Sequence, residues 1–162
     1  GNKKVFAIYP NGEKQELISS IDKNLSFPEI MTDLNFDGIN DLAIHTGVNP
    51  RGLNSSYTFY IWDNNNKKLT EKGVFVNPNI ENGFLVENSL DTSFSCEPIC
   101  IHRDQYKWAN NRYQLHSSIT EVKKSSNMKI RFMKDQKVIK TVIVSSEKIQ
   151  SETEKWDTEN HD

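Results

Sequence analysis

The chain has 162 residues, of which 35% are hydrophobic and 26% charged, and its formal net charge is -2. This length suits one domain that buries a core, and the near-neutral charge gives no overall field that would attract nucleic acid or an anionic membrane. The sequence contains no apolar run of about 18 residues, so no transmembrane helix is predicted. It begins with Gly1 instead of Met, from which we expect that a targeting segment was removed and that the precursor could carry a lipid anchor.

Short strand patterns follow one another along the chain. Alternating apolar and polar residues, aromatic and β-branched side chains, and turns such as Asn11-Gly12 predict about ten of them. They are residues 4–9, 14–19, 42–46, 56–62, 68–76, 83–88, 99–108, 112–122, 128–133 and 137–144. The expected fold is an all-β antiparallel meander over residues 1–146, which suits a small β-propeller, a sandwich or a barrel.

Residues 147–162 are polar and acidic. Such a composition predicts a tail outside the β domain that either forms a helical turn or stays disordered.

One segment specifies chemistry: residues 33–41 read D-x-N-x-D-G-x-x-D, the first half of an EF-hand calcium loop. Closely spaced carboxylates repel one another, and Ca2+, which accepts six to eight oxygens, relieves that repulsion. The expected ligands are Asp33, Asn35, Asp37, the carbonyl of Ile39, and Asp41. The closing glutamate of an EF-hand is replaced by Ile44, and extended segments rather than helices are predicted on both sides, so Asp41 would become the strongest ligand. The alternative is an Asx-rich turn without a metal.

The two cysteines, Cys96 and Cys100, lie four positions apart with Pro98 between them. This spacing favours a small disulfide loop and therefore an oxidising compartment. Two alternatives are free thiols and a metal site that adds His102, for which structural zinc would need further ligands.

Two loops are candidates for contact with a partner. The glycine-containing loop 47–55 carries Arg51, and the loop 91–98 carries Asp91, Phe94 and Glu97. Long loops on a rigid scaffold often carry function, although ordinary solvated surface loops would look the same.

The calcium segment resembles the calcium loops of FG-GAP and VCBS repeats, which lie in β-propeller blades. The chain is more similar to a family of small bacterial periplasmic proteins with one such loop, through the aromatic strand at Tyr57–Asp63 and the hairpin at Tyr106–Leu115. The similarity covers roughly residues 29–122. It implies a propeller-like fold, bound calcium, and a role as an immunity protein that inhibits lysozyme-like effectors injected by another bacterium. The cysteine pair departs from the glycine-rich loop expected in that family.

The expected function is therefore a non-catalytic, calcium-binding periplasmic inhibitor of a peptidoglycan hydrolase. A calcium-stabilised carbohydrate-binding or surface-adhesion module is the alternative, with Tyr57, Tyr60, Trp62 and Trp108 stacking on sugars. A hydrolase is a third reading, but it would need two carboxylates facing each other across a cleft, which spacing alone does not reveal.

Overall fold

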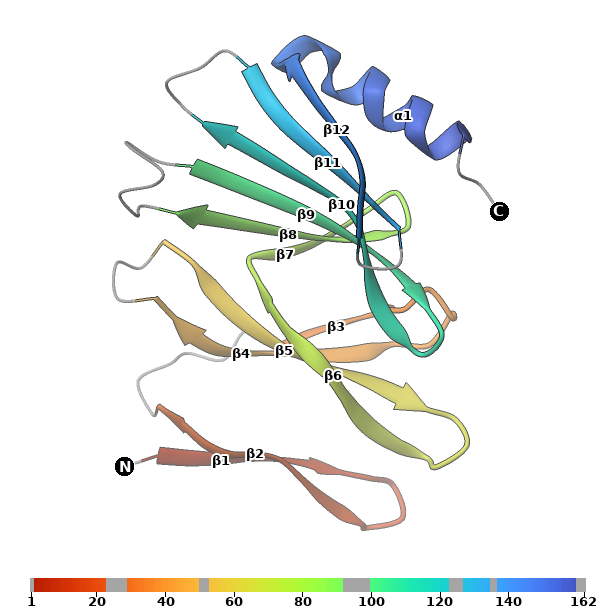
Figure 1. Cartoon of the computed structure of the whole chain (residues 1–162). Coiled ribbons are helices and arrows are strands. Elements are labelled where there is room, and N and C mark those ends of the chain that lie inside the picture. Colours follow the sequence, from red (N-terminus) through yellow and green to blue (C-terminus); the bar gives the residue numbers. More distant parts are fainter. Residues whose placement is uncertain are drawn as a thin grey trace.

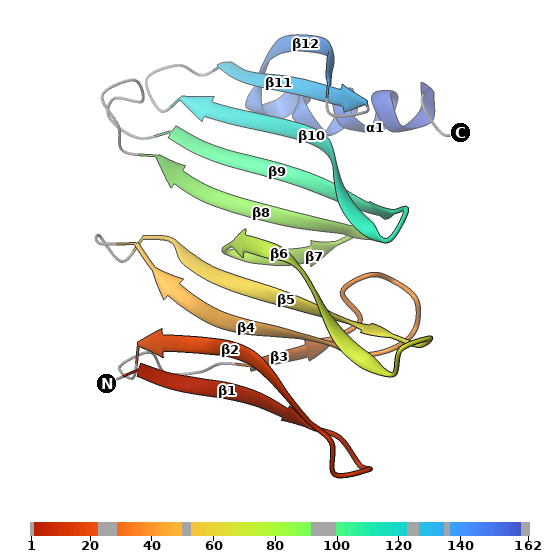
Figure 2. The same cartoon turned by 60° about the horizontal axis from the view of Figure 1, so that its bottom comes forward.

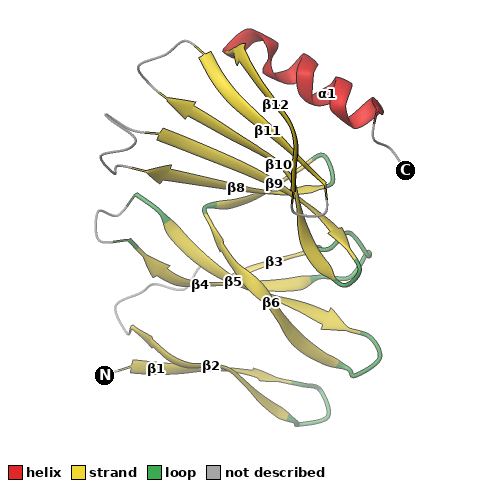
Figure 3. Ribbon diagram, viewed as in Figure 1, coloured by secondary structure: helices red, strands yellow, loops and turns green. Residues whose placement is uncertain are grey.

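The computed structural model of the chain describes residues 2–22, 29–49, 53–91, 100–122, 127–134 and 137–159. These residues form twelve antiparallel strands in three sheets, followed by one α-helix (Figure 1; Figure 3). The strands are β1 (Asn2–Ile8), β2 (Lys14–Asp22), β3 (Glu29–Thr32), β4 (Asp41–Val48), β5 (Ser55–Asp63), β6 (Lys68–Val76), β7 (Pro78–Glu81), β8 (Phe84–Asp91), β9 (Cys100–Ala109), β10 (Arg112–Val122), β11 (Asn127–Lys134) and β12 (Lys137–Ser145).

Each sheet is a meander of sequence neighbours. The sheets are β1-β2, β3-β4-β5-β6 and β7 to β12, the last in the order β12-β11-β10-β9-β8-β7. The predicted all-β antiparallel fold is confirmed, with β3 and β7 as two strands that the pattern did not indicate. Within the described residues no sheet closes into a barrel, and the sheets have two, four and six strands, unlike the equal blades of a regular propeller.

The main core lies between the four-stranded and the six-stranded sheet. Phe59 of β5 packs against Phe75 of β6 with ring centroids 4.9 Å apart, and Tyr113 of β10 meets Phe75 edge-on at 5.0 Å. Leu85 of β8 is fully buried in the same cluster. The alternation of large apolar side chains along β5 therefore points one row of residues at the opposite sheet.

The last strand leads into a short 3-10 helix (Ser146–Lys148) and then into α1 (Ile149–Glu159). Trp156 of α1 is 5% exposed and stacks on Phe132 of β11 with centroids 4.8 Å apart. For the acidic segment the sequence predicted either a helical turn or a disordered tail. Its residues Ile149–Glu159 form a helix, which is docked on the outer face of the six-stranded sheet (Figure 1). No helix in the described part of the chain has the length and apolar character needed to cross a membrane.

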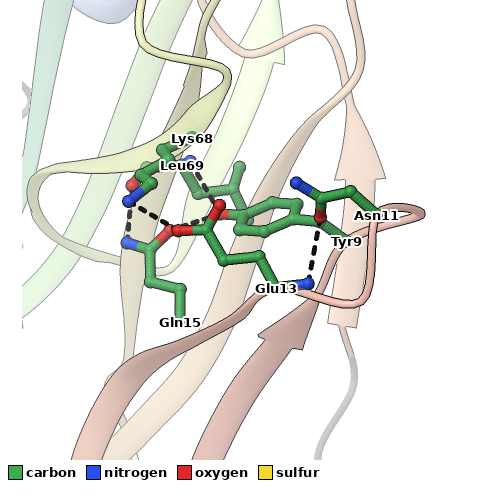
Figure 4. Close-up of polar contacts among 6 residues, drawn as sticks. All are labelled: Tyr9, Asn11, Glu13, Gln15, Lys68 and Leu69. Atoms are coloured by element: carbon green, nitrogen blue, oxygen red, sulfur yellow. Dashed lines mark hydrogen bonds and ion pairs between the residues drawn. The ribbon is translucent and has the colours of Figure 1, made fainter.

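The β1-β2 hairpin forms its own sheet beside the four-stranded one (Figure 2). Side chains at its turn join it to the β5-β6 hairpin (Figure 4). The Gln15 amide donates to the carbonyl of Leu69 at 2.9 Å, and the N–H of Leu69 donates to the Tyr9 hydroxyl at 3.1 Å. The Tyr9 hydroxyl in turn donates to the amide oxygen of Gln15. Lys68 and Glu13 add an exposed ion pair at 2.7 Å. The two hairpins are therefore joined through side chains and not through a shared backbone ladder.

The candidate metal segment and the candidate partner loops lie at opposite ends of the strands. Strands β4, β8 and β10 end, and β5, β9 and β11 begin, at one end, which we call the loop end (Figures 1 and 2). Residues 33–40, which join β3 to β4, lie at the other end. The candidate metal segment and the candidate partner loops are consequently separated by the length of the strands.

Candidate functional site

The candidate metal segment, residues 33–41, is a compact turn anchored in the core by Leu34, which is 2% exposed. The Tyr113 hydroxyl of β10 donates to the carbonyl of Leu34 at 2.8 Å. Phe36 and Gly38 adopt positive φ angles of 66° and 87°. A glycine at position 38 therefore fits the sharp turn that the motif requires there.

Within this segment the side-chain oxygens accept hydrogen bonds from nearby backbone N–H groups. Asp33 accepts from Asp37 at 3.1 Å and from Gly38 at 2.8 Å. Asn35 accepts from Asp37 at 3.2 Å, and Asp37 accepts from the N–H of Ile39 at 2.8 Å. The turn is thus folded around the oxygens of three of the predicted ligands.

Asp41, the first residue of β4, is 1% exposed. One carboxylate oxygen accepts from the N–H of Leu34 and the other from the N–H of Trp62, both at 2.9 Å. Burial raises the pKa of Asp41, these backbone donors lower it, and the charge of Asp37 raises it. Asp41 therefore ties the start of the turn to β4 and to the end of β5.

The negative charge of this segment is not balanced by an ion pair among the residues that the structure describes. In the described part of the chain no Lys, Arg or His forms an ion pair with Asp33, Asp37 or Asp41. Uncompensated, partly buried carboxylates fit a hard cation with oxygen ligands. The Asn35 amide nitrogen, however, donates to Asp37 at 2.8 Å, and no group of three or more His, Cys, Asp or Glu in the described residues is arranged around a common point. Calcium binding stays a prediction.

The partner residues and the cysteine pair are only partly within the described residues. Arg51, Phe94, Glu97 and Cys96 lie outside them. Asp91 is the last residue of β8, opposite Cys100 on β9, and its carboxylate lies 3.9 Å from the His102 imidazole. Cys100 is buried and is not a free thiol, while its pairing with Cys96 stays a prediction.

Strand pairing shortens the first candidate loop and shifts the second by one residue relative to the sequence prediction. Gly47 and Val48 continue β4 beyond a bulge and pair with Ser56 and Ser55 of β5. β8 likewise extends to Asp91. The backbone connections at the loop end are therefore residues 49–54 and 92–99.

The aromatic residues considered for sugar stacking are packing residues. Tyr60 is 3% exposed and donates its hydroxyl to the carbonyl of Leu17 in β2. Tyr57 and Trp108 pack against the main core, and Trp62 meets the Tyr9 ring. These four side chains are engaged in packing contacts, so they do not support the alternative of a carbohydrate-binding module.

Sequence reasoning missed a half-buried polar cluster between the sheets. Glu87 of β8 accepts from the N–H of Val76 at 2.9 Å and from the Tyr106 hydroxyl at 3.0 Å. Its cross-strand neighbour Asp104 has one buried carboxylate oxygen without a hydrogen bond. The pattern gave little signal, because a polar residue on a strand is usually assigned to the solvent face.

A scan of protein-family models and a search of curated proteins find no match to this chain. Among solved structures, one described as "Structure of a Xanthomonas Type IV Secretion System related protein" is similar, with a TM-score of 0.63 and 23% sequence identity. The similarity covers 86% of this chain and 77% of that one. At this identity the comparison supports a shared fold.

Proposed function

We propose that this protein is a non-catalytic, calcium-stabilised periplasmic inhibitor of a lysozyme-like peptidoglycan hydrolase. The observation that carries the proposal is the β4-β5 hairpin. Asp41 closes its open end by accepting from the N–H of Trp62, and Arg51 belongs in sequence to the connection between the two strands. A cation bound at residues 33–41 would stabilise the hairpin that presents the contact loop.

The chemistry of inhibition needs no reacting group in this chain. An inhibitor that places a loop in a substrate cleft gains affinity when that loop is held in its bound shape before association. The paired strands that flank each connection fix the residues at which it starts and ends. We therefore assign cleft contact to Arg51, Asp91, Phe94 and Glu97, and assign to calcium a role in stability.

The similar solved structure is described as related to a Type IV secretion system, and the proposal adopts a secretion-related setting from it by analogy of fold, since a fold alone does not determine function. The cysteine pair supports an oxidising compartment, because disulfides persist outside the cytosol.

The test is clearing of a cell-wall suspension by the hydrolase encoded beside the gene, with and without this protein. We expect inhibition that weakens with Arg51→Ala and Glu97→Ala while the melting temperature stays constant. Asp63→Ala, in the β5-β6 turn at the opposite end, is the matched control and should inhibit normally. Failure of any neighbouring hydrolase to be bound or slowed at micromolar protein would rule the proposal out.

A second candidate function, saccharide binding, is favoured by a groove of about 690 Å³ between α1 and the exposed face of β8 and β9. Asn88, Gln105 and Gln150 line it beside an Arg103–Glu81 ion pair and the Phe84 ring. Amides supply both donors and acceptors, which suits the hydroxyls of a neutral sugar. Titration with soluble peptidoglycan fragments decides this candidate: binding that Gln105→Ala abolishes supports it, and no heat or chemical-shift change dismisses it.

A further inference from the structure

The six-stranded sheet ends on β12 at one edge and on β7 at the other (Figures 1 and 2). Within the described residues β12 forms its backbone ladder with β11 alone. Every second residue of such an edge strand directs its N–H and C=O away from the sheet. β12 therefore offers a row of backbone donors and acceptors to a further strand.

The other edges of the two larger sheets carry features that discourage strand addition, whereas the second half of β12 does not. β3 and β7 have four residues each, and β7 begins with Pro78. β6 is interrupted by a bulge at Lys72. The bulge of β12 lies at Ile139, and its register with β11 is regular from residue 140 to residue 145. Residues 141–145, T-V-I-V-S, contain no charge, proline or glycine, so they keep the regular edge that strand addition needs.

The side chains of this regular stretch alternate between a packed face and an exposed face. Val142 and Val144 pack against the cluster that contains Trp156 of α1. Ile143 points to the opposite face and is 69% exposed. Val138 and Ile139, near the start of the strand, are 51% and 57% exposed. One edge strand thus exposes three large apolar side chains, the combination that marks a strand for pairing with another chain.

The sequence of β12 is complementary to itself when a second copy runs antiparallel to it. A two-fold axis perpendicular to the sheet pairs each residue with one at the same distance beyond the axis, and both members of a pair lie on one face. With the axis at Ile143, this residue faces its own counterpart. Val142 then faces Val144 twice, and Thr141 faces Ser145 twice. The ladder therefore joins β-branched and small polar residues without a charge.

Two neighbouring positions of the axis are less favourable. An axis at Thr141 would bring the bulged Ile139 into the ladder, and an axis at Val142 would place the ammonium group of Lys140 against an apolar partner. With the axis at Ile143, Lys140 of one copy lies beyond the ladder, at the level of residues 146–147 of the other. Glu147 there is exposed and has the opposite charge, which favours this register.

We propose that β12 is a self-association edge, through which two copies of the chain pair antiparallel over residues 141–145 and join their six-stranded sheets. Because each copy uses the same edge, the contact closes after two copies and gives a dimer instead of a filament. One short ladder is a small interface, so the dimer should be weak, with a Kd on the order of 10 to 100 µM. The inference does not depend on the proposed function, since β12 lies outside the metal segment and both candidate loops.

Sedimentation velocity over a concentration series that brackets this Kd tests the proposal. The wild-type sedimentation coefficient should rise from that of a monomer to that of a dimer and no further. Ile143→Lys places two ammonium groups opposite each other and should weaken association at least about tenfold. Val74→Lys, at a residue of edge strand β6 that is 55% exposed, is the matched control and should dimerise like the wild type. A wild-type monomer at every concentration, growth beyond the dimer, or a dimer that survives Ile143→Lys would overturn the inference.

A charge-pair experiment tests the register and covers poor folding of one variant. Ile143→Glu alone should also be monomeric, whereas an equimolar mixture of Ile143→Lys and Ile143→Glu should dimerise, because residue 143 faces residue 143 across the axis. Misfolded variants would not regain association on mixing. A mixture that stays monomeric would overturn the register.

Amide hydrogen exchange identifies the surface that pairs. In the wild-type protein, exchange of a peptide covering residues 138–145 should slow at high concentration, and in Ile143→Lys it should not. Slower exchange confined to other strands would contradict the proposal. If the peptide is protected only when a peptidoglycan hydrolase is added, the edge pairs with the hydrolase and the second copy is the wrong occupant.

Discussion

Asp41 is the residue on which the metal hypothesis depends. A buried carboxylate costs free energy unless donors or a cation compensate its charge. Asp41 accepts from the backbone N–H groups of Leu34 and Trp62 and forms no ion pair with any described residue. Its neighbours Asp33 and Asp37 add to the negative charge instead of reducing it. A bound cation would offset the repulsion among these carboxylates.

We predict that Ca2+ raises the melting temperature of the wild-type protein by mass action, with about 2.7 kcal/mol at a hundredfold excess over Kd. Asp37→Ala should remove most of that increment because it deletes a ligand. Asp63→Ala is the control: Asp63 also accepts backbone N–H bonds in a turn, from Asn65 and Asn66, but lies outside the segment. Scanning calorimetry with EDTA and with excess Ca2+ provides the readout, and identical curves would identify a plain Asx-rich turn.

Glu87 should make stability depend on pH. Burial raises the pKa of Glu87, the N–H of Val76 and the Tyr106 hydroxyl lower it, and the charge of Asp104 raises it. The folded state consequently holds the proton more tightly than the unfolded chain. The stabilisation from this group is present below the ordinary carboxyl pKa and is lost as the pH rises through the raised value.

We predict that Glu87→Gln reduces this loss, since glutamine keeps an acceptor for Val76 without titrating. Between about pH 4 and pH 7 its unfolding free energy should fall less than that of the wild-type protein. Urea denaturation at each pH measures the difference, with the exposed Glu71→Gln as control. Parallel curves for wild type and Glu87→Gln would show that Glu87 does not carry the effect.

At the scale of elements, α1 is anchored by Trp156, its buried side chain among the described residues, with Ile149 packed against the same cluster. We predict that Trp156→Ala destabilises the protein by about 3–5 kcal/mol, the usual cost of truncating a buried Trp. Lys155→Ala changes an exposed neighbour in the same helix and should have little effect. The unfolding midpoint in guanidinium reports both, and a loss below about 1 kcal/mol for Trp156→Ala would mean that the helix is a dispensable appendage.

A disulfide would constrain the connection between β8 and β9. We predict a Cys96–Cys100 disulfide, whose entropic stabilisation stays below the roughly 3 kcal/mol of a 15-residue loop. Its main effect would be to hold the connection in one shape and lower the ordering cost of binding. Mass spectrometry of alkylated, unreduced protein from an oxidising compartment should find no modified thiol; two modified cysteines would exclude the bond.

At the scale of the whole molecule, stability should be unequal among the three sheets. The β1-β2 hairpin shares no ladder with its neighbours and is joined to them through side chains such as Tyr9 and Gln15. We predict that its amides exchange before those of β9 and β10, which are central to the six-stranded sheet. Tyr9→Phe should widen the gap by removing the hydroxyl that accepts from Leu69. Simultaneous exchange of all strands would instead indicate one cooperative unit.

Most strands could be predicted because their signals are local. The alternation in residues 56–62 and the Asn11-Gly12 turn act over a few residues, and the structure places β5 and the β1-β2 turn there. β3 and β7 are four-residue strands, too short for a periodic signal to emerge. The extension of β4 through Gly47 follows from pairing with β5 across a bulge, which no single-strand pattern encodes.

By itself, the sequence determined the all-β meander and the oxygen-rich segment at Asp33–Asp41, because strand periodicity and Asx-turn chemistry depend on neighbours in the chain. Only the tertiary structure decided that α1 docks through Trp156, that Glu87 is half-buried between sheets, and that Asn54 reaches Leu90. Each of these depends on which surfaces meet across more than ten positions of sequence. Packing free energy, which selects among such encounters, is not expressed in any local pattern.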